Sequence, residues 1–343
     1  MAFEQESSPR SASWRSALWL GVFACVFLFV GWSAYWYVAR RMAENEFHTQ
    51  LEREAQVGRI WTCASLTFRG YPLSISIDCS DPRLRIENGA GPAIISARRA
   101  LIAARLYTPT LVDIDVTAPA EVDTDGARTS LDWTSLQIET RGLPKRLDRL
   151  SIIGRGLTVE FANSAASRAD AIHLNLRRTT PSQMAPYALA LGLAGIDSPA
   201  LTKLIGAGGP ALFTALGSVT QLDAATAGLW TERLQSWSAA GGRATIAALS
   251  LTRDAFAVEA EGSVGLDQQH RPDGKFAVKV RNAGPALLTL AEASGKVQRN
   301  SIAGQLALGV LGRPGELKFD VTADGGALSI GPLRRLLTLP ALY

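Results

Sequence analysis

The sequence predicts a mainly β (α+β) protein: a single N-terminal transmembrane helix, then a large curved antiparallel β-sheet with a short helical insert. Three observations lead to this fold class. An uncharged apolar stretch covers 17–38, apolar and polar residues alternate through most of the chain after residue 60, and an Ala-, Leu- and Gly-rich segment interrupts the alternation at 181–217. Alternation with a period of two is typical of strands with one buried face, and about 20 consecutive apolar residues are typical of a membrane span.

The apolar stretch reads ALWLGVFACVFLFVGWSAYWYV and contains neither a charge nor a proline. With a rise of about 1.5 Å per residue, a helix of this length spans roughly 33 Å, enough to cross a hydrocarbon core of about 30 Å. Four aromatic residues gather at its C-terminal end: Trp32, Tyr35, Trp36 and Tyr37. Aromatic rings favour the headgroup level of a bilayer. Because a cleavable signal has a shorter apolar core and a small-residue cleavage site, we expect an uncleaved signal-anchor, with a cleaved signal as the alternative.

The span divides the chain into segments with different expected roles. Residues 1–16 are polar and are expected to form a short cytoplasmic stub, and residues 39–59 contain good helix formers that continue the span as a stalk. Residues 60–343 are expected to form one periplasmic β-rich domain, with a short helix over 285–293. In the insert 181–217, prolines favour two or three short apolar helices, with a second membrane span as the alternative.

Cys63 and Cys79 flank a predicted hairpin whose turn is Gly70-Tyr71-Pro72. Two strands that meet at this turn bring the cysteines close enough to bond, and a loop of this size would stabilise the fold by about 3 kcal/mol. Two buried free thiols are the alternative, and a metal site is not expected because no histidine or further cysteine lies nearby. Since disulfides form in oxidising compartments, the pair places the β-rich domain in the periplasm and the N-terminus in the cytoplasm.

The strands with one apolar face supply candidate ligand-contacting residues. Such a series must bury its apolar face, either as a filled sandwich or as an open trough, and the small number of large aromatic side chains favours the trough. We expect two triplets of alternating apolar residues to line this groove as a group. They are Val112, Ile114, Val116, Leu157, Val159 and Phe161.

Charge and motif content argue against several functional classes. A formal net charge of +4 is too small for the electrostatic footprint of a nucleic-acid-binding protein. The three histidines have no partners at metal-ligand spacing, and the sequence contains no nucleophile elbow and no phosphate-binding loop. Asp113 and Asp115 point to one side of a strand, but their alternation with Val and Ile indicates a solvated face. We therefore expect no catalytic residues, no metal and no cofactor.

The cysteine hairpin resembles the signature of DUF2125, an uncharacterised bacterial family. Trp61-x-Cys63, the Gly70-Tyr71-Pro72 turn and Cys79 match the family pattern W-x-C…GYPFR…C, with Leu73-Ser74 in place of the usual Phe-Arg. Later motifs fall at Gly262–Asp267, Arg271–Gly274, Asp324-Gly325, Gly331-Pro332 and Leu339-Pro340. The resemblance covers most of residues 15–343 and implies a membrane-anchored bacterial protein without an assigned activity. The rhythm of the strands is also similar to that of AsmA-like envelope proteins, which implies lipid transport or envelope maintenance.

The sequence therefore predicts a non-enzymatic, single-pass protein of the bacterial inner membrane with its C-terminal domain in the periplasm. We expect its groove to bind or pass a lipid or another apolar ligand, and we expect no nucleic-acid partner. The alternative is a structural or scaffolding protein with a filled core that docks another envelope protein, and an unidentified hydrolase ranks third. A hollow concave face favours the groove, and a filled one favours the scaffold.

Overall fold

A computed structural model describes most of the chain: residues 11–88, 91–124, 126–142, 146–162, 164–180, 182, 185–206, 208–225, 230–284, 315–331 and 333–342. This part is mainly strand in one large antiparallel sheet, preceded by an apolar N-terminal helix, and the predicted fold class is confirmed. The helix expected over 285–293 and residues 1–10 of the expected stub lie outside the described residues.

Helix α1 runs without a break over Ser11–Gln56, so the predicted span and the predicted stalk are parts of one helix. Its side chains are exposed from residue 17 to residue 32, and its length and composition suffice to cross a membrane. The helix ends just before Gly58, which has φ +76° and donates its N–H to the carbonyl of Ala55 at 3.1 Å. Glycine adopts this left-handed conformation without steric strain, which is why it commonly terminates helices.

The strands divide into two groups along the chain. The first group contains β1 (Arg59–Thr62), β2 (Ser65–Arg69), β3 (Ser74–Ser80), β4 (Arg83–Asn88), β5 (Gly91–Arg105), β6 (Thr108–Thr124), β7 (Ala127–Asp132), β8 (Ser135–Arg141) and β9 (Arg149–Phe161). The second group contains β10 (Ser167–Arg178), β11 (Tyr187–Ile196), β12 (Ala211–Val219), β13 (Ala244–Arg253), β14 (Phe256–Leu266), β15 (Pro272–Arg281), β16 (Glu316–Asp324), β17 (Ala327–Ile330) and β18 (Leu333–Thr338). The short helices among the described residues are α2 (Pro199–Ile205), η1 (Leu222–Ala225) and α3 (Trp230–Ala239).

The strands form one antiparallel meander. The long strand β5 pairs with both β3 and β4, and β6 and β9 each pair with both β7 and β8, so these short strands are collinear pieces of single rows. From β9 to β18 each strand pairs with the next one in the sequence. Hairpin connections of this kind keep neighbouring strands adjacent in space.

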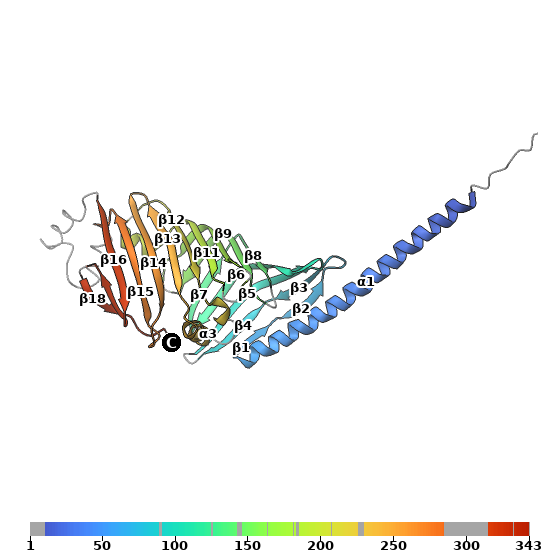
Figure 1. Cartoon of the computed structure of the whole chain (residues 1–343), viewed down its shortest axis with the longest axis horizontal. Coiled ribbons are helices and arrows are strands. Elements are labelled where there is room, and N and C mark those ends of the chain that lie inside the picture. The colour runs from blue at the N-terminus through green and yellow to red at the C-terminus, as the bar shows by residue number, and fades with distance from the viewer. Residues whose placement is uncertain are drawn as a thin grey trace, which may run out of the picture.

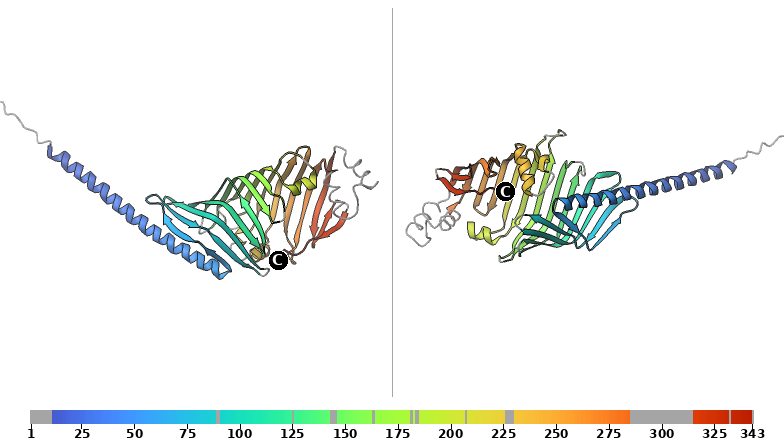
Figure 2. Two further views of the ribbon diagram at one scale, coloured as in Figure 1. Left: turned by 180° about the vertical axis from the view of Figure 1, so that it is seen from behind. Right: turned by 90° about the horizontal axis from the view of Figure 1, so that it is seen from below.

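The sheet twists and curls along its length, and α1 projects from its N-terminal end (Figures 1 and 2). The curl brings the connection between β12 and β13 back to the start of the sheet. The hydrogen bond between Arg59 and Glu54 has the largest effect on the two groups and raises the pKa of Arg59 and lowers that of Glu54. The charges of Glu232 and Arg233 on α3 act in the same directions, on Arg59 and Glu54 respectively. The two groups of strands are therefore parts of one curved wall.

The prediction of a helical insert over 181–217 is wrong. The described part of this segment is mostly β11 and β12, with the seven-residue helix α2 between them. Leucines at 189, 191 and 193 alternate with Ala188, Ala190 and Gly192. Because small apolar residues occupy the second face of the strand, the period of two is hidden by a uniformly apolar composition.

A line of irregular backbone crosses the sheet from the β3–β4 junction to β11. Asp81, Gly156 and Gly195 have φ values of +46°, +61° and +68°, and the register between β5 and β6 shifts beside Ala118-Pro119. On β9 this irregularity resets the alternation of side chains. A Cβ placed on Gly154 would lie 3.5 Å from Cδ2 of Leu157, so Leu157 reaches the same side of the sheet as Gly154.

Candidate apolar groove

One face of the sheet carries an unbroken row of apolar side chains, which we call the apolar lane. Each member is the direct cross-strand partner of the next, and partners of this kind point to the same side of an antiparallel sheet. The lane is Phe68, Ile77, Ile102, Ile114, Ile138, Ile152, Leu174, Leu191, Ala215, Leu249, Ala260, Val278 and Phe319. It extends from the hairpin beside α1 to the strand β16 near the C-terminus.

The lane lies on the inner face of the curl. Phe47 of α1 packs edge-on against Phe68, the first member, with 6.1 Å between the ring centroids. Further along, the buried side chains of Arg178 and Arg253 project from the same face and hold chain segments at its rims. The N-terminal end of the lane therefore begins at the helix that is long enough to cross a membrane.

In the described part of the chain, the inner face has no tightly packed core of large side chains. Except for Ala215, which is buried, the members of the lane are half-buried. Half of the buried hydrophobic residues that the structure describes are alanines. This set is Trp36, Cys79, Ala185, Tyr187, Ile205, Ala211, Ala215, Ala257, Val280 and Ala283. A filled sandwich would bury large aliphatic side chains from both of its layers. The described residues instead form a single layer with an open apolar side.

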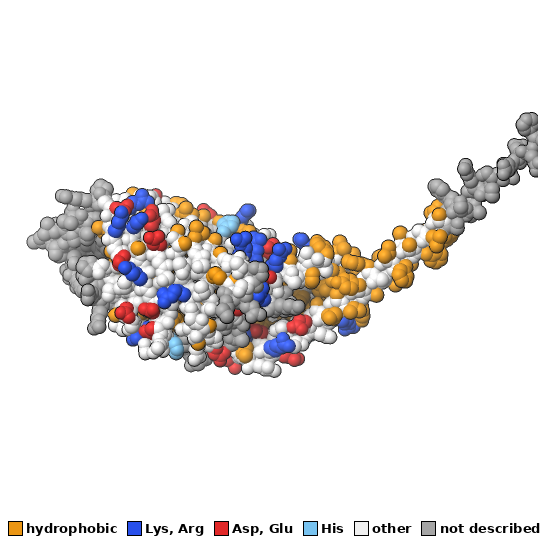
Figure 3. Space-filling view, in the orientation of Figure 1, with side chains coloured by type: hydrophobic (Ala, Val, Ile, Leu, Met, Phe, Trp, Pro, Cys, Tyr) orange, Lys and Arg blue, Asp and Glu red, His pale blue; other side chains and the backbone are white. Residues whose placement is uncertain are grey.

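The outer face is polar over much of its area. The row displaced by one residue from the lane contains Asp78, Asp115, Gln137, His173, Glu259 and Lys279. Figure 3 shows acidic and basic side chains side by side on this face of the C-terminal strands, where Lys275 pairs with Asp320 at 2.8 Å. Water solvates the charged side chains of this face well, whereas contact between water and the apolar side chains of the lane is unfavourable.

Shallow hollows on the outer face are weaker candidates for a site. One of about 290 Å³ is lined by Asp113, Asp115 and Glu139, and another of about 510 Å³ lies over Ala188 and Ala190. They arise where short side chains lie between longer ones on a curved surface. In the chain that the structure describes, no group of His, Cys, Asp and Glu is arranged to hold a metal ion.

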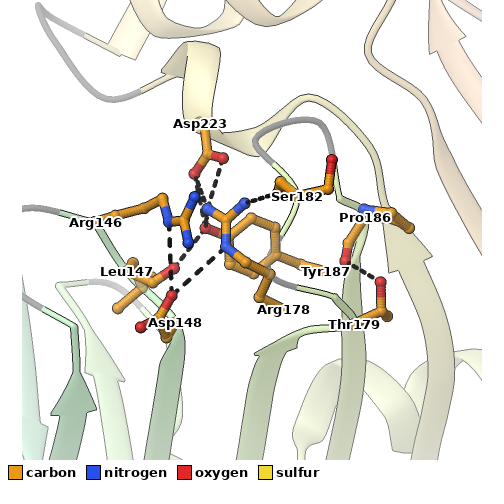
Figure 4. Close-up of polar contacts among 9 residues, drawn as sticks. All are labelled: Arg146, Leu147, Asp148, Arg178, Thr179, Ser182, Pro186, Tyr187 and Asp223. Carbon is orange, nitrogen blue, oxygen red and sulfur yellow. Dashed lines mark hydrogen bonds and ion pairs between the residues drawn. The ribbon is translucent and has the colours of Figure 1, made fainter.

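A buried polar cluster closes one rim of the inner face (Figure 4). The side chain of Arg178, 3% exposed, binds both carboxylate oxygens of Asp223 at 2.5 and 2.6 Å and stacks over the ring of Tyr187 at 4.6 Å. The Tyr187 hydroxyl lies 2.6 Å from the carbonyl oxygen of Leu147, and Arg178 Nη1 donates to the carbonyl of Ser182 at 3.0 Å. The cluster fixes η1, and with it the β12–β13 connection, against the ends of β10 and β11.

The electrostatics of this cluster follow from its burial. Burial alone would raise the pKa of Asp223, but hydrogen bonds from Arg178 and Tyr187 outweigh it and lower the pKa. Burial, with the hydrogen bond to Asp223, raises the pKa of Tyr187 to about 12. The tyrosine is therefore neutral and the aspartate charged at neutral pH, which suits a structural clamp.

A second buried arginine holds the opposite rim. Nε of Arg253 donates to the carbonyl of Gly209 at 2.8 Å, Nη2 donates to the carbonyl of Gly208 at 3.0 Å, and both terminal nitrogens reach Oγ1 of Thr202 at 3.1 Å. These contacts fix α2 and the loop that follows it. The inner face is thus bordered by one arginine clamp on each rim, with the lane between them.

The comparisons with known proteins give a family. A family model described as an uncharacterized protein conserved in bacteria, DUF2125, matches residues 36–340. The chain belongs to the DUF2125 family. The search of curated proteins found no match, and neither did the search of solved structures. The family resemblance of the cysteine hairpin is thereby confirmed, and the looser similarity to AsmA-like proteins stays a prediction.

The six predicted groove residues of this DUF2125 protein occupy two different places. Ile114 is a member of the lane, and Val112 and Val116 flank it on β6. Leu157, Val159 and Phe161 lie beyond the irregular backbone at Gly156, where Phe161 is exposed at the margin of the sheet. Leu157 nevertheless reaches the same side of the sheet as Gly154, and contact of the two triplets with a ligand stays a prediction.

The predicted cysteine pair forms a disulfide. Cys63 and Cys79 are bonded, with 5.5 Å between their Cα atoms, and Cys79 is buried on the inner face. Cys63 lies at the break between β1 and β2, so the bond joins the first row of the sheet to the second at the point where the first row is interrupted.

Sequence reasoning missed the two arginine clamps of the DUF2125 domain, although a signal for them exists. Arg178 continues the apolar positions 172, 174 and 176, and Arg253 continues the apolar positions 249 and 251. A cation at an apolar strand position must find a buried partner, because an unpaired buried charge is strongly unfavourable. The identity of the partners, such as Asp223, is set by the tertiary fold.

Proposed function

We propose that this DUF2125 protein is a membrane-anchored periplasmic protein that binds the acyl chains of lipids along the apolar lane, without catalysing a reaction. The observation that carries the proposal is the unbroken row of apolar partners from Phe68 to Phe319 on a half-buried face. A contiguous apolar surface that the fold leaves partly exposed is typical of a binding site for an apolar partner. The disulfide supports the periplasmic location, and α1 supports the anchor.

The dimensions of the lane favour a long flexible ligand. Adjacent strands lie about 4.8 Å apart, so the row from β2 to β16 extends roughly 55 Å along the curl, more than the roughly 30 Å thickness of a bilayer core. A closed pocket would select one small ligand, whereas a continuous row accepts an acyl chain at successive positions. Because the row begins beside α1, its first position is the one nearest to the membrane.

A photo-crosslinking amino acid placed in β11 tests lipid binding directly. The probe replaces Leu191, a member of the lane, or Ala190, its neighbour on the outer face, in the full-length protein in bacterial membranes. We expect a phospholipid adduct, detected by mass spectrometry, at position 191 and none at position 190. Equal labelling at both positions, or none at position 191, would argue against the groove.

Native mass spectrometry and lipid uptake by the full-length protein distinguish the lipid-binding proposal from the scaffold alternative. We expect native mass spectrometry to detect co-purifying lipid, and the purified chain to take up a fluorescent fatty acid. A clean protein mass and no uptake would support a scaffold that docks another envelope protein.

The state of the cysteines tests the periplasmic location. Alkylation of both Cys63 and Cys79 in unreduced cells would contradict it.

A further inference from the structure

The tip of the β2–β3 hairpin is bound to α1 inside the apolar stretch. Trp32 Nε1 donates to the carbonyl of Pro72 at 2.9 Å, and the hydroxyls of Ser33 and Tyr71 lie 2.8 Å apart. The ring of Trp36 meets the ring of Tyr71 edge-on at 5.3 Å. The helix residues in these contacts all lie within 17–38, the stretch that is expected to cross the bilayer.

These contacts set the depth of the tip relative to the membrane. Trp32 precedes Val38, the last residue of the apolar stretch, by six residues, which corresponds to about 9 Å along a helix. A 22-residue apolar stretch is only slightly longer than a hydrocarbon core of about 30 Å. A group that binds Trp32 therefore lies near the boundary between acyl chains and headgroups when α1 spans the bilayer.

The tip exposes the side chains that this boundary favours. Tyr71 is 47% exposed and Leu73 is 57% exposed, although both are large and apolar. A second hairpin tip lies beside the first, because Leu106 of the β5–β6 turn donates its N–H to the carbonyl of Leu73 at 3.1 Å. Its neighbour Tyr107 is 65% exposed. Aromatic and leucine side chains partition into the interfacial layer of a bilayer.

Basic residues flank both tips. Arg69 immediately precedes the first turn and Arg105 immediately precedes the second, and both are exposed. On the outer face Arg141, Arg149 and Arg177 are successive cross-strand partners at the same edge of the sheet as the two turns. Arginines next to an apolar tip suit the anionic headgroups that surround an inserted side chain.

We propose that the tips of the β2–β3 and β5–β6 hairpins insert into the interfacial layer of the leaflet from which α1 emerges. Tyr71, Leu73 and Tyr107 enter the layer, and Arg69 and Arg105 contact its headgroups. The sheet is then held to the membrane at its tips as well as by its helix. This arrangement rests on the membrane-spanning role of α1, but it does not depend on lipid binding in the lane.

Depth-dependent fluorescence quenching tests the insertion. The free Cys25 is replaced by alanine, the disulfide is kept, and a single cysteine is introduced by Leu73→Cys, Tyr107→Cys or Ser164→Cys for labelling with an environment-sensitive fluorophore. Ser164 is exposed in the β9–β10 turn at the opposite edge of the sheet and is the matched control. Each full-length variant is reconstituted in vesicles of phosphatidylethanolamine and phosphatidylglycerol, with or without nitroxide-labelled lipids.

We expect blue-shifted emission at positions 73 and 107, with several-fold stronger quenching by headgroup-labelled lipid than at position 164. Emission at either tip that matches position 164 would overturn the proposal. Blue-shifted emission without quenching by lipid would also overturn it, because another protein surface would then cover the tip. Flotation of the protein with the vesicles tests the membrane anchor α1 separately. Failure to float would contradict both the anchor and the insertion. Flotation without quenching at the tips would support the anchor and contradict only the insertion.

Discussion

The inner and outer faces of the sheet are made by the same strands and differ by a displacement of one residue. The inner row is apolar at every position from β2 to β16, whereas the outer row passes through Asp78, Asp115 and Lys279. In a sandwich the apolar row would pack against a second sheet. Here the described segments beside it are held at its rims by two arginine clamps. This difference between the faces is the basis of the proposal that an apolar partner from outside the fold completes the inner face.

The largest difference between the two faces is expected in the stability lost when either of two adjacent arginines is replaced. Arg178 is buried on the inner face, and Arg177 is exposed on the outer face. Arg178→Ala leaves Asp223 partly buried without the guanidinium that binds both of its oxygens, so we expect the free energy of unfolding to fall by about 3–5 kcal/mol. For Arg177→Ala we expect a change below about 0.5 kcal/mol. Urea denaturation of both variants measures the difference, and equal losses would contradict the assignment of Arg178 to a buried clamp.

The disulfide ranks next. Cys79 is buried on the inner face, and its bond to Cys63 closes a loop with a sequence separation of 16. Replacing both cysteines with alanine should lower the free energy of unfolding by about 3 kcal/mol, because the unfolded chain gains conformational freedom. Cys25→Ala is the matched control and should leave the denaturation midpoint unchanged. Wild-type protein that unfolds at the same midpoint with and without reductant would contradict the prediction.

The clamp also predicts a loss of stability in alkali. The pKa of Tyr187 is about 12 in the folded protein, and that of an unfolded tyrosine is about 10. Below pH 10 both states hold the proton, and between these values only the folded state does, so the free energy of unfolding falls as pH rises. The total loss is on the order of 2 kcal/mol by pH 12. Denaturation of the wild type and of Tyr187→Phe across this range isolates the effect, since the variant should lack this contribution to the slope.

Lipid uptake compares the faces at a single strand. Leu191→Asp places a charge in the lane, where it must be desolvated by a bound acyl chain, whereas Ala190→Asp places the same charge on the outer face. We expect at least about tenfold weaker uptake of a fluorescent fatty acid by the first variant, equivalent to about 1.4 kcal/mol. The second variant should bind like the wild type. Equal weakening in both variants would show that the charge acts through general destabilisation.

The sequence predicts which residues share a face within each strand, but it does not predict how neighbouring strands are aligned. Ile114 was predictable because it alternates with Asp113 and Asp115, and that local pattern is also visible in the structure. The direct pairing of Ile114 with Ile102 and Ile138 depends on turn lengths and on the register shift beside Ala118-Pro119, which a period of two does not encode. On β9 the left-handed Gly156 interrupts the period of two, so Gly154 and Leu157 share a side of the sheet although they are three residues apart.

The prediction of helices in residues 181–217 was wrong for a different reason. Its strands have small apolar residues such as Ala190 on the outer face and leucines on the inner face, so composition concealed the alternation. The arginine clamps were missed because their partners come from distant connections, as Asp223 does for Arg178. Local periodicity thus predicts which face a residue takes, and the tertiary fold decides what covers that face.

The smallest effect is expected on the outer face directly beside the disulfide. Asp78 neighbours Cys79 in β3, and its carboxylate binds Arg99 of β5 at 2.6 and 2.7 Å. Hydrogen bonding from Arg99 lowers the pKa of Asp78, but water and salt reach the pair, and exposed ion pairs contribute little to stability. We expect Arg99→Ala to leave the denaturation midpoint unchanged at physiological salt. If Arg99→Ala instead destabilised the protein as much as loss of the adjacent disulfide, the outer row would have a structural role of its own, and the asymmetry between the faces would no longer point to the lane as the site.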